Sequence, residues 1–128
     1  MKVIIETPAA GGKTKFALQY VLEAGRPALF ISTEDDAIRL RNRLGFSPGL
    51  CLIVSKVYTV QDAKATVGKV IRQPGPVIRT IVLDVNSVGN DHWNQFADVL
   101  SEMGFTVVLT RNIRKEHASL VHPSNVVI

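Results

Sequence analysis

The residues with the clearest chemical potential lie near the start of the chain, in the sequence Thr7-Pro8-Ala9-Ala10-Gly11-Gly12-Lys13-Thr14. They follow a short apolar run at residues 3–5 and precede a helical pattern that begins with Phe16. A strand, a glycine-bearing loop, Lys-Thr and a helix are the layout of a phosphate-binding loop. Backbone N–H groups at the N-terminus of a helix lack partners within the helix, so they can bind phosphate oxygens.

Within this stretch we expect the Lys13 ammonium to contact the phosphates and the Thr14 hydroxyl to bind Mg²⁺. The spacing matches the pattern G-x-x-x-x-G-K-[ST] except at its first position, where Thr7 stands in place of glycine. A strand-to-helix turn without a ligand is the alternative for this stretch taken alone. The other residues that we predict to bind the nucleotide are Pro8, Ala9, Ala10, Gly11, Gly12 and Lys15.

Three further polar residues follow apolar runs that have the length of buried strands. Asp84 is suited to hold Mg²⁺, Glu34 could orient the water that attacks the terminal phosphate, and Asn112 could contact the γ-phosphate. Each has a structural alternative. Asp84 and Asn112 could be turn residues, and an acid such as Glu34 stabilises the first turn of a helix by about 0.3 to 1 kcal/mol.

Basic residues gather after the last long apolar run, at Arg111, Arg114 and Lys115. They could supply the positive charge that stabilises phosphoryl transfer, either within one chain or from a neighbouring subunit. They could also contact nucleic acid phosphates. A solvated basic loop is the alternative for any one of them.

Short apolar runs alternate with helical patterns along the chain. All-apolar strands separated by helices are typical of a parallel sheet that is covered on both faces. We therefore predict one α/β domain over residues 1–128, a three-layer α/β/α sandwich with a mostly parallel sheet. Ligands of such sheets bind beyond the carboxyl ends of the strands, where the candidate residues lie. The predicted strands are 3–5, 28–32, 50–54, 81–84, 105–109 and 126–128, and the predicted helices are 13–24, 34–44, 60–71 and 91–103.

Composition narrows the class of protein further. The only cysteine among the 128 residues is Cys51, which excludes an internal disulfide and a cysteine-based zinc site. A net charge of +4 favours anionic partners but does not diagnose nucleic acid binding. We find no apolar signal segment and no apolar run near the ~20 residues of a membrane span, so we expect a cytoplasmic protein.

The candidate residues resemble those of the RecA-like P-loop ATPases, and in particular the group typified by KaiC and RadA. Residues 12–20 and 28–35 resemble the phosphate loop, first helix and acid-ended second strand of that group. Residues 81–84 are similar to its Walker B strand, and residues 106–113 to its sensor strand. The resemblance implies a RecA-like core with ATP and Mg²⁺ as cofactors.

The resemblance also implies roles that the residues alone leave open. Glu34 would be the general base, and the site would be completed in trans by a basic finger from the next subunit of a ring or filament. By position, Arg114 and Lys115 are the candidates for that finger. Nucleic acid is a further candidate partner, and no membrane partner is expected.

The predicted function is therefore ATP binding with Mg²⁺-dependent hydrolysis of the β–γ phosphoanhydride, coupled to oligomer assembly or to nucleic acid transactions. A non-hydrolysing regulatory or scaffold module that binds nucleotide is the first alternative. A viral-type helicase or packaging motor is the second, although such motors carry Asp-Glu where this chain has Asp84 and Val85. A nucleoside kinase of the thymidine kinase type is a further alternative, but it would need several cysteine ligands for zinc, and this chain has only Cys51.

Overall fold

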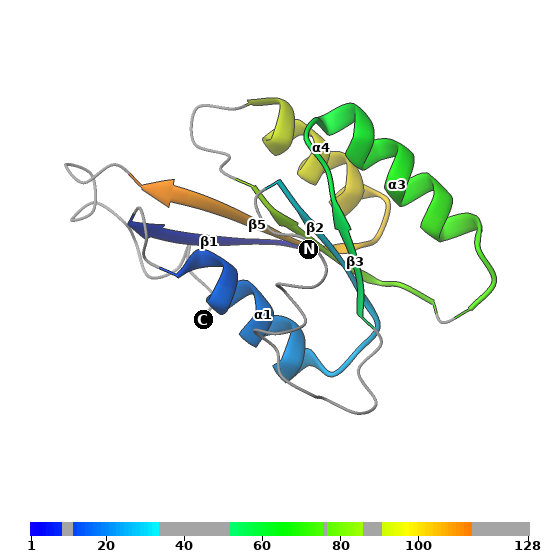
Figure 1. Cartoon of the computed structure of the whole chain (residues 1–128), viewed down its shortest axis with the longest axis horizontal. Coiled ribbons are helices and arrows are strands. Elements are labelled where there is room, and N and C mark those ends of the chain that lie inside the picture. The colour runs from blue at the N-terminus through cyan, green and yellow to red at the C-terminus, as the bar shows by residue number, and fades with distance from the viewer. Residues whose placement is uncertain (9–11, 34–51, 76, 86–90, 114–128) are drawn as a thin grey trace.

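The computed structural model describes residues 1–8, 12–33, 52–75, 77–85 and 91–113. The predicted helix 34–44, the predicted strand 126–128 and Cys51 lie outside these ranges. The described elements, labelled as in Figure 1, are β1 (Lys2–Pro8), α1 (Lys13–Ala24), β2 (Ala28–Ser32), β3 (Leu52–Lys56), α3 (Val60–Arg72), β4 (Thr80–Asp84), α4 (Asp91–Glu102) and β5 (Thr106–Ile113).

The described strands form one sheet in the order β1-β5-β4-β2-β3, and every neighbouring pair is parallel. This confirms the α/β class and the parallel sheet. The last described strand, β5, lies between β1 and β4, so the strand that precedes the loop and the strand that ends in Asp84 flank the same neighbour. The carboxyl ends of all five strands therefore meet at one edge of the sheet.

Helices cover both faces of the sheet. Helix α1 packs on one face, and α3 and α4 pack on the other (Figure 1). Strand β2 shows how the sequence supplies both faces: Ala28 and Phe30 join the core under α1, whereas Leu29 and Ile31 join the core under α3 and α4. Successive side chains of a strand point to opposite faces, so an all-apolar strand must be covered twice.

The helices begin and end where local sequence predicts. Gly25 ends α1 with a left-handed φ of 63° and donates its N–H to the carbonyl of Val21. The Thr59 side chain caps α3 by accepting a 3.1 Å hydrogen bond from the N–H of Asp62. These described helices have 12 or 13 residues, and none of them could cross a membrane.

Four strands have bounds that differ from the prediction, and of these β4 begins one residue earlier than predicted, at Thr80. Strand β1 continues through Thr7 and Pro8, and β5 continues to Ile113, because the two strands stay paired from Lys2 with Val107 to Pro8 with Ile113. Strand β3 covers residues 52–56 where we predicted 50–54. Backbone pairing with a neighbour thus extends strands into polar sequence that an apolar pattern does not mark.

Candidate phosphate-binding site

Polar side chains replace apolar ones at the carboxyl ends of four strands, on the sheet face that α1 covers. Deeper in the sheet this face is apolar, with Val3 and Ile5 in β1, Phe30 in β2, Val82 in β4 and Val108 in β5. Residues two positions apart share a face of a strand, so the next residues along these strands on this face are the polar ones. We call the following set the polar band: Thr7, Ser32, Asp84, Thr110 and Asn112.

The strand register orders the polar band into two rows. Ser32 lies opposite Asp84, and the Thr110 hydroxyl lies 3.1 Å from a carboxylate oxygen of Asp84, so these three residues form an inner row. Thr7 lies opposite Asn112, two residues further along their strands, and forms an outer row. Of these five residues, all but Asn112 are buried.

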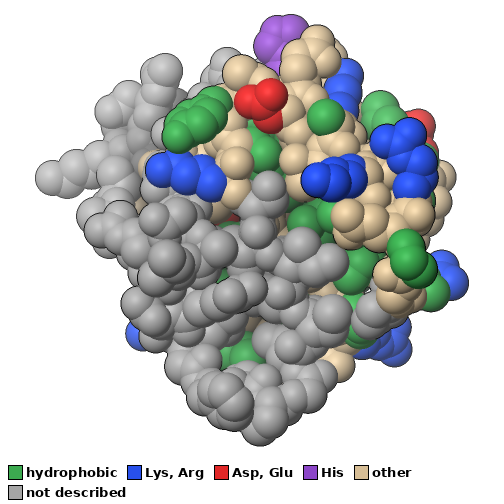
Figure 2. All heavy atoms as spheres, turned by 45° about the vertical axis from the view of Figure 1, so that its right-hand side comes forward, with side chains coloured by type: hydrophobic (Ala, Val, Ile, Leu, Met, Phe, Trp, Pro, Cys, Tyr) green, Lys and Arg blue, Asp and Glu red, His purple; other side chains and the backbone are tan. Residues whose placement is uncertain are grey.

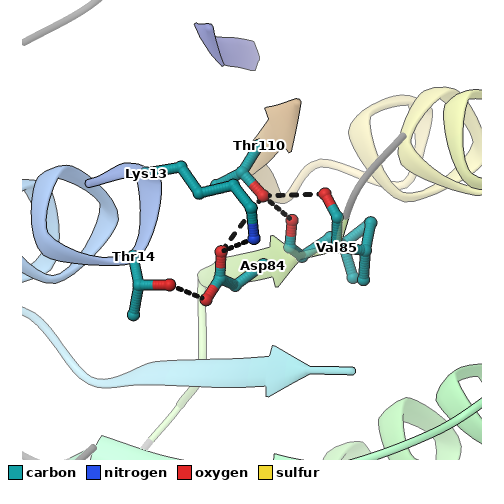
Figure 3. Close-up of polar contacts among 6 residues, drawn as sticks. Lys13, Thr14, Asp84, Val85 and Thr110 are labelled. Carbon is teal, nitrogen blue, oxygen red and sulfur yellow. Dashed lines mark hydrogen bonds and ion pairs between the residues drawn. The ribbon is translucent and has the colours of Figure 1, made fainter. Parts of the chain in front are cut away.

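Asp84 is the centre of the polar band, and its exposed fraction is zero. The Thr14 hydroxyl donates to its Oδ2 atom at 2.7 Å, and the Lys13 Nζ atom lies 3.5 Å from its Oδ1 atom (Figure 3). A carboxylate withdrawn from water needs a countercharge and hydrogen-bond donors to remain ionised at low cost. Lys13 and Thr14 provide both from the first turn of α1.

Thr110 connects the polar band to the backbone after β4. Its hydroxyl lies 2.9 Å from the carbonyl oxygen of Val85, 3.1 Å from Asp84 Oδ1 and 3.4 Å from the carbonyl oxygen of Leu83 (Figure 3). A hydroxyl has one proton to donate, so these three acceptors share it. Sequence reasoning did not identify Thr110, although its place two residues after the buried Val108 was a usable signal.

The approach of α1 to Asp84 depends on Gly12. This residue has a φ of +83°, a conformation that favours glycine, and its carbonyl oxygen accepts the N–H of Phe16 at 3.0 Å to begin the helix. The turn brings Lys13 and Thr14 onto the sheet, where they are 7% and 6% exposed. An ammonium group has three N–H donors, so Lys13 can contact more than one acceptor at once.

Arg111 lies on the opposite face of the sheet from the polar band. It belongs to β5, not to a loop after it as predicted, and its guanidinium contacts Glu6 Oε1 at 3.2 Å and Asn94 Oδ1 at 2.9 Å. Its position in β5 alternates with those of Thr110 and Asn112, which accounts for the opposite direction. The structure therefore does not bring the Arg111 guanidinium to Lys13 and Asp84, and pairs it with Glu6 and Asn94 instead.

The other predicted residues divide into described and undescribed ones. Pro8 at the end of β1 and Lys15 in α1 are exposed, and Asn112 is half-buried. Thr33 donates its N–H to the Asp84 carbonyl oxygen at 3.4 Å, so the chain that leads to position 34 passes beside Asp84. The predicted residues outside the described ranges are Ala9, Ala10, Gly11, Glu34, Arg114 and Lys115.

Two hollows of the described surface lie away from the polar band. One of about 540 Å³ lies between α3 and α4, and one of about 290 Å³ lies at the opposite edge of the sheet, near Arg79 and Gly104. Figure 2 shows Lys and Arg side chains standing apart on the described part of this side of the molecule, not in one continuous stripe. The buried polar groups, and not these surfaces, therefore define the candidate site.

A search of protein-family models finds no match to this chain, and no curated protein matches it. Among the described residues, no group of three or more His, Cys, Asp or Glu side chains is placed to hold a metal ion. Of the described residues, Thr14 and Thr110 place hydroxyl oxygens beside the Asp84 carboxylate. Mg²⁺ is usually bound by one or two protein oxygens, and its other ligands are waters and phosphate oxygens.

Proposed function

We propose that this chain is an ATP-binding P-loop NTPase with a RecA-like core and Mg²⁺-dependent hydrolysis. The observation that carries the proposal is the meeting of Lys13 and Thr14 with the buried carboxylate of Asp84, some 70 residues away in sequence. A simple strand-to-helix turn has no need for a lysine, a threonine and an aspartate at one buried point. Together they provide a cation for phosphate and two oxygen ligands for a metal.

The donor set fits ATP and Mg²⁺. The Thr14 hydroxyl and the Asp84 carboxylate are hard oxygen ligands, and the 2.7 Å between them supports a single small metal site within reach of both. When bound, Mg²⁺ neutralises charge on the β and γ phosphates. Lys13 and the backbone N–H groups at the start of α1 would hold the phosphates, because that helix end carries partial positive charge.

The position of β5 supports the RecA-like part of the proposal. This strand lies between β1 and β4, so Asn112 is carried to the same edge as Lys13 and Asp84, opposite Thr7. An amide there is suited to sense the γ-phosphate. From the resemblance, Glu34 acts as the general base, Pro8 and Lys15 flank the phosphates with residues 9–11, and Arg114 or Lys115 acts in trans within a homo-oligomer.

Substitution of Lys13 tests the proposal, with binding of ATP and Mg²⁺ measured by calorimetry. Lys13→Met keeps the aliphatic stem and removes the charge, so ATP affinity should be lost. The matched control is Lys69→Ala, which removes an exposed lysine of α3 on the other face of the sheet. Equal ATP affinity in the wild type and in Lys13→Met would overturn the phosphate site.

Loss of Lys13 also withdraws a countercharge from Asp84, so folding needs its own measurement. Thermal unfolding and circular dichroism of Lys13→Met identify a folded variant. If it does not fold, Thr14→Val serves in its place, because it removes an oxygen ligand without changing charge. A folded Thr14→Val with unchanged Mg²⁺-dependent ATP affinity would count against the proposal in the same way.

A further inference from the structure

Thr7 has a buried hydroxyl that none of the described residues hydrogen-bonds. The residue is 3% exposed, and its Oγ atom has no hydrogen-bond partner among the residues that the structure describes. Buried side-chain oxygens are nearly always paired, since a hydroxyl without a partner loses its bonds to water and gains nothing in return. A buried hydroxyl without a partner among the described residues is therefore a candidate ligand contact.

The position of Thr7 indicates which ligand this would be. Val3, Ile5 and Thr7 are the buried residues of β1, so Thr7 faces α1 and not α4. It lies opposite Asn112 in the outer row of the polar band, near the end of β1 and six residues before Lys13 in the sequence. The same face of the sheet carries the Lys13 ammonium and the N-terminus of α1, which both favour an anion.

A structural role alone does not account for threonine at this place. Valine has nearly the same shape, is well suited to a strand and would leave no polar atom unpaired. Glycine, which the loop pattern has at this position, would leave none either. The hydroxyl is the one property that separates threonine from both.

We propose that Thr7 is a phosphate-binding residue whose hydroxyl donates a hydrogen bond to a phosphate oxygen of the bound nucleotide. This inference rests on the proposed function and extends it with a side-chain contact from β1. Replacement of the pattern's glycine by Thr7 then adds a ligand to the site. The proposed contact is a hydrogen bond in the bound complex, and it involves no proton transfer and no change in covalent bonds.

The test compares Thr7→Val, Thr7→Ser and the wild type, with ATP and inorganic tripolyphosphate as probes in the presence of Mg²⁺. Calorimetry should show about a tenfold or greater loss of affinity for both probes in Thr7→Val, as expected for a hydrogen bond to a charged group. Thr7→Ser, which keeps the hydroxyl, should bind both probes within about threefold of the wild type. Tripolyphosphate isolates the phosphate contact from any contact to the nucleoside.

Thermal unfolding without ligand gives an independent readout. Because the hydroxyl is unpaired, Thr7→Val should unfold at the same temperature as the wild type or at a higher one. Thr80→Val is the matched control, since Thr80 is also buried, at 6% exposure, but begins β4 at the other edge of the sheet. It should bind both probes as the wild type does.

The outcomes separate this inference from the proposed function. If Thr7→Val binds both probes as tightly as the wild type while Lys13→Met does not, the phosphate site stands and Thr7 is not part of it. A clear drop in the unfolding temperature of Thr7→Val would show a structural hydrogen bond and overturn the inference. Absence of binding by the wild type itself would overturn the proposed function, and the role of Thr7 with it.

Discussion

Two ion pairs, one buried and one half-buried, lie at the same edge of the sheet on opposite faces, and they differ in what surrounds them. The Lys13 and Asp84 side chains are 8% and 0% exposed, whereas those of Arg111 and Glu6 are 26% and 13% exposed. Hydroxyl groups and a helix N-terminus surround the first pair. The second pair and Asn94 join β1, β5 and α4.

The difference distinguishes a candidate site on one face of this edge from a structural contact on the other face. On the α4 face, the guanidinium has a carboxylate and an amide oxygen as acceptors, which suits a cross-link between elements. On the α1 face, Asp84 gathers a lysine and two hydroxyl groups at one point. Burying a carboxylate beside a lysine and hydroxyl groups is costly if stability is its only role. The same arrangement suits the binding of a metal and phosphate.

Asp84 should give the largest effect on folding. Asp84→Ala takes the Asp84 carboxylate away from the buried Lys13 ammonium, so we expect the free energy of unfolding to fall by about 3–5 kcal/mol. Chemical denaturation measures this loss. Asp84→Asn keeps the shape and should fold, but it should lose Mg²⁺-dependent ATP binding, and retention of that binding would remove Asp84 from the metal site.

Glu34→Gln should separate ATP binding from turnover. If Glu34 is the general base, the variant should bind ATP as the wild type does and lose about 10²–10⁴-fold in turnover. Phosphate release measured over a range of protein concentrations also tests the finger in trans, because specific activity should then rise as the oligomer assembles. Wild-type binding without turnover at any concentration would favour the regulatory or scaffold alternative.

The smallest effect should come from the other face. Arg111→Met removes a half-buried guanidinium but keeps an apolar stem, so we expect a loss of about 1 kcal/mol in the free energy of unfolding. ATP affinity should not change. A large loss of ATP affinity in a folded Arg111→Met would mean that the two faces are coupled and that the contrast between the two pairs is wrong.

Features that depend on neighbours in sequence were predictable. The end of α1 at Gly25, the Thr59 cap of α3 and the burial of Trp93 follow from local capping chemistry and helical periodicity. The parallel sheet follows from strands that are apolar on both faces. These features need only a few adjacent residues, so the sequence contains them directly.

The candidate site was predictable in part. Lys13, Thr14 and Asp84 stand out by residue type and spacing, and the carboxyl edge of a parallel sheet brings them together in any such fold. Their direct contacts, 3.5 Å for Lys13 and 2.7 Å for Thr14, required the structure. The role of Thr110 was missed because a threonine after an apolar run has no distinctive pattern.

The sequence by itself thus determined the class of fold and the identity of the central Lys13, Thr14 and Asp84. Only the tertiary structure decided that Arg111 faces away from them and that Thr7 lies buried in β1, its hydroxyl without a partner among the described residues. The physical reason is that pairing with β5 extends β1 to Pro8 and sets the face of every residue in both strands. That pairing joins residues about a hundred positions apart, a separation over which local patterns carry no information.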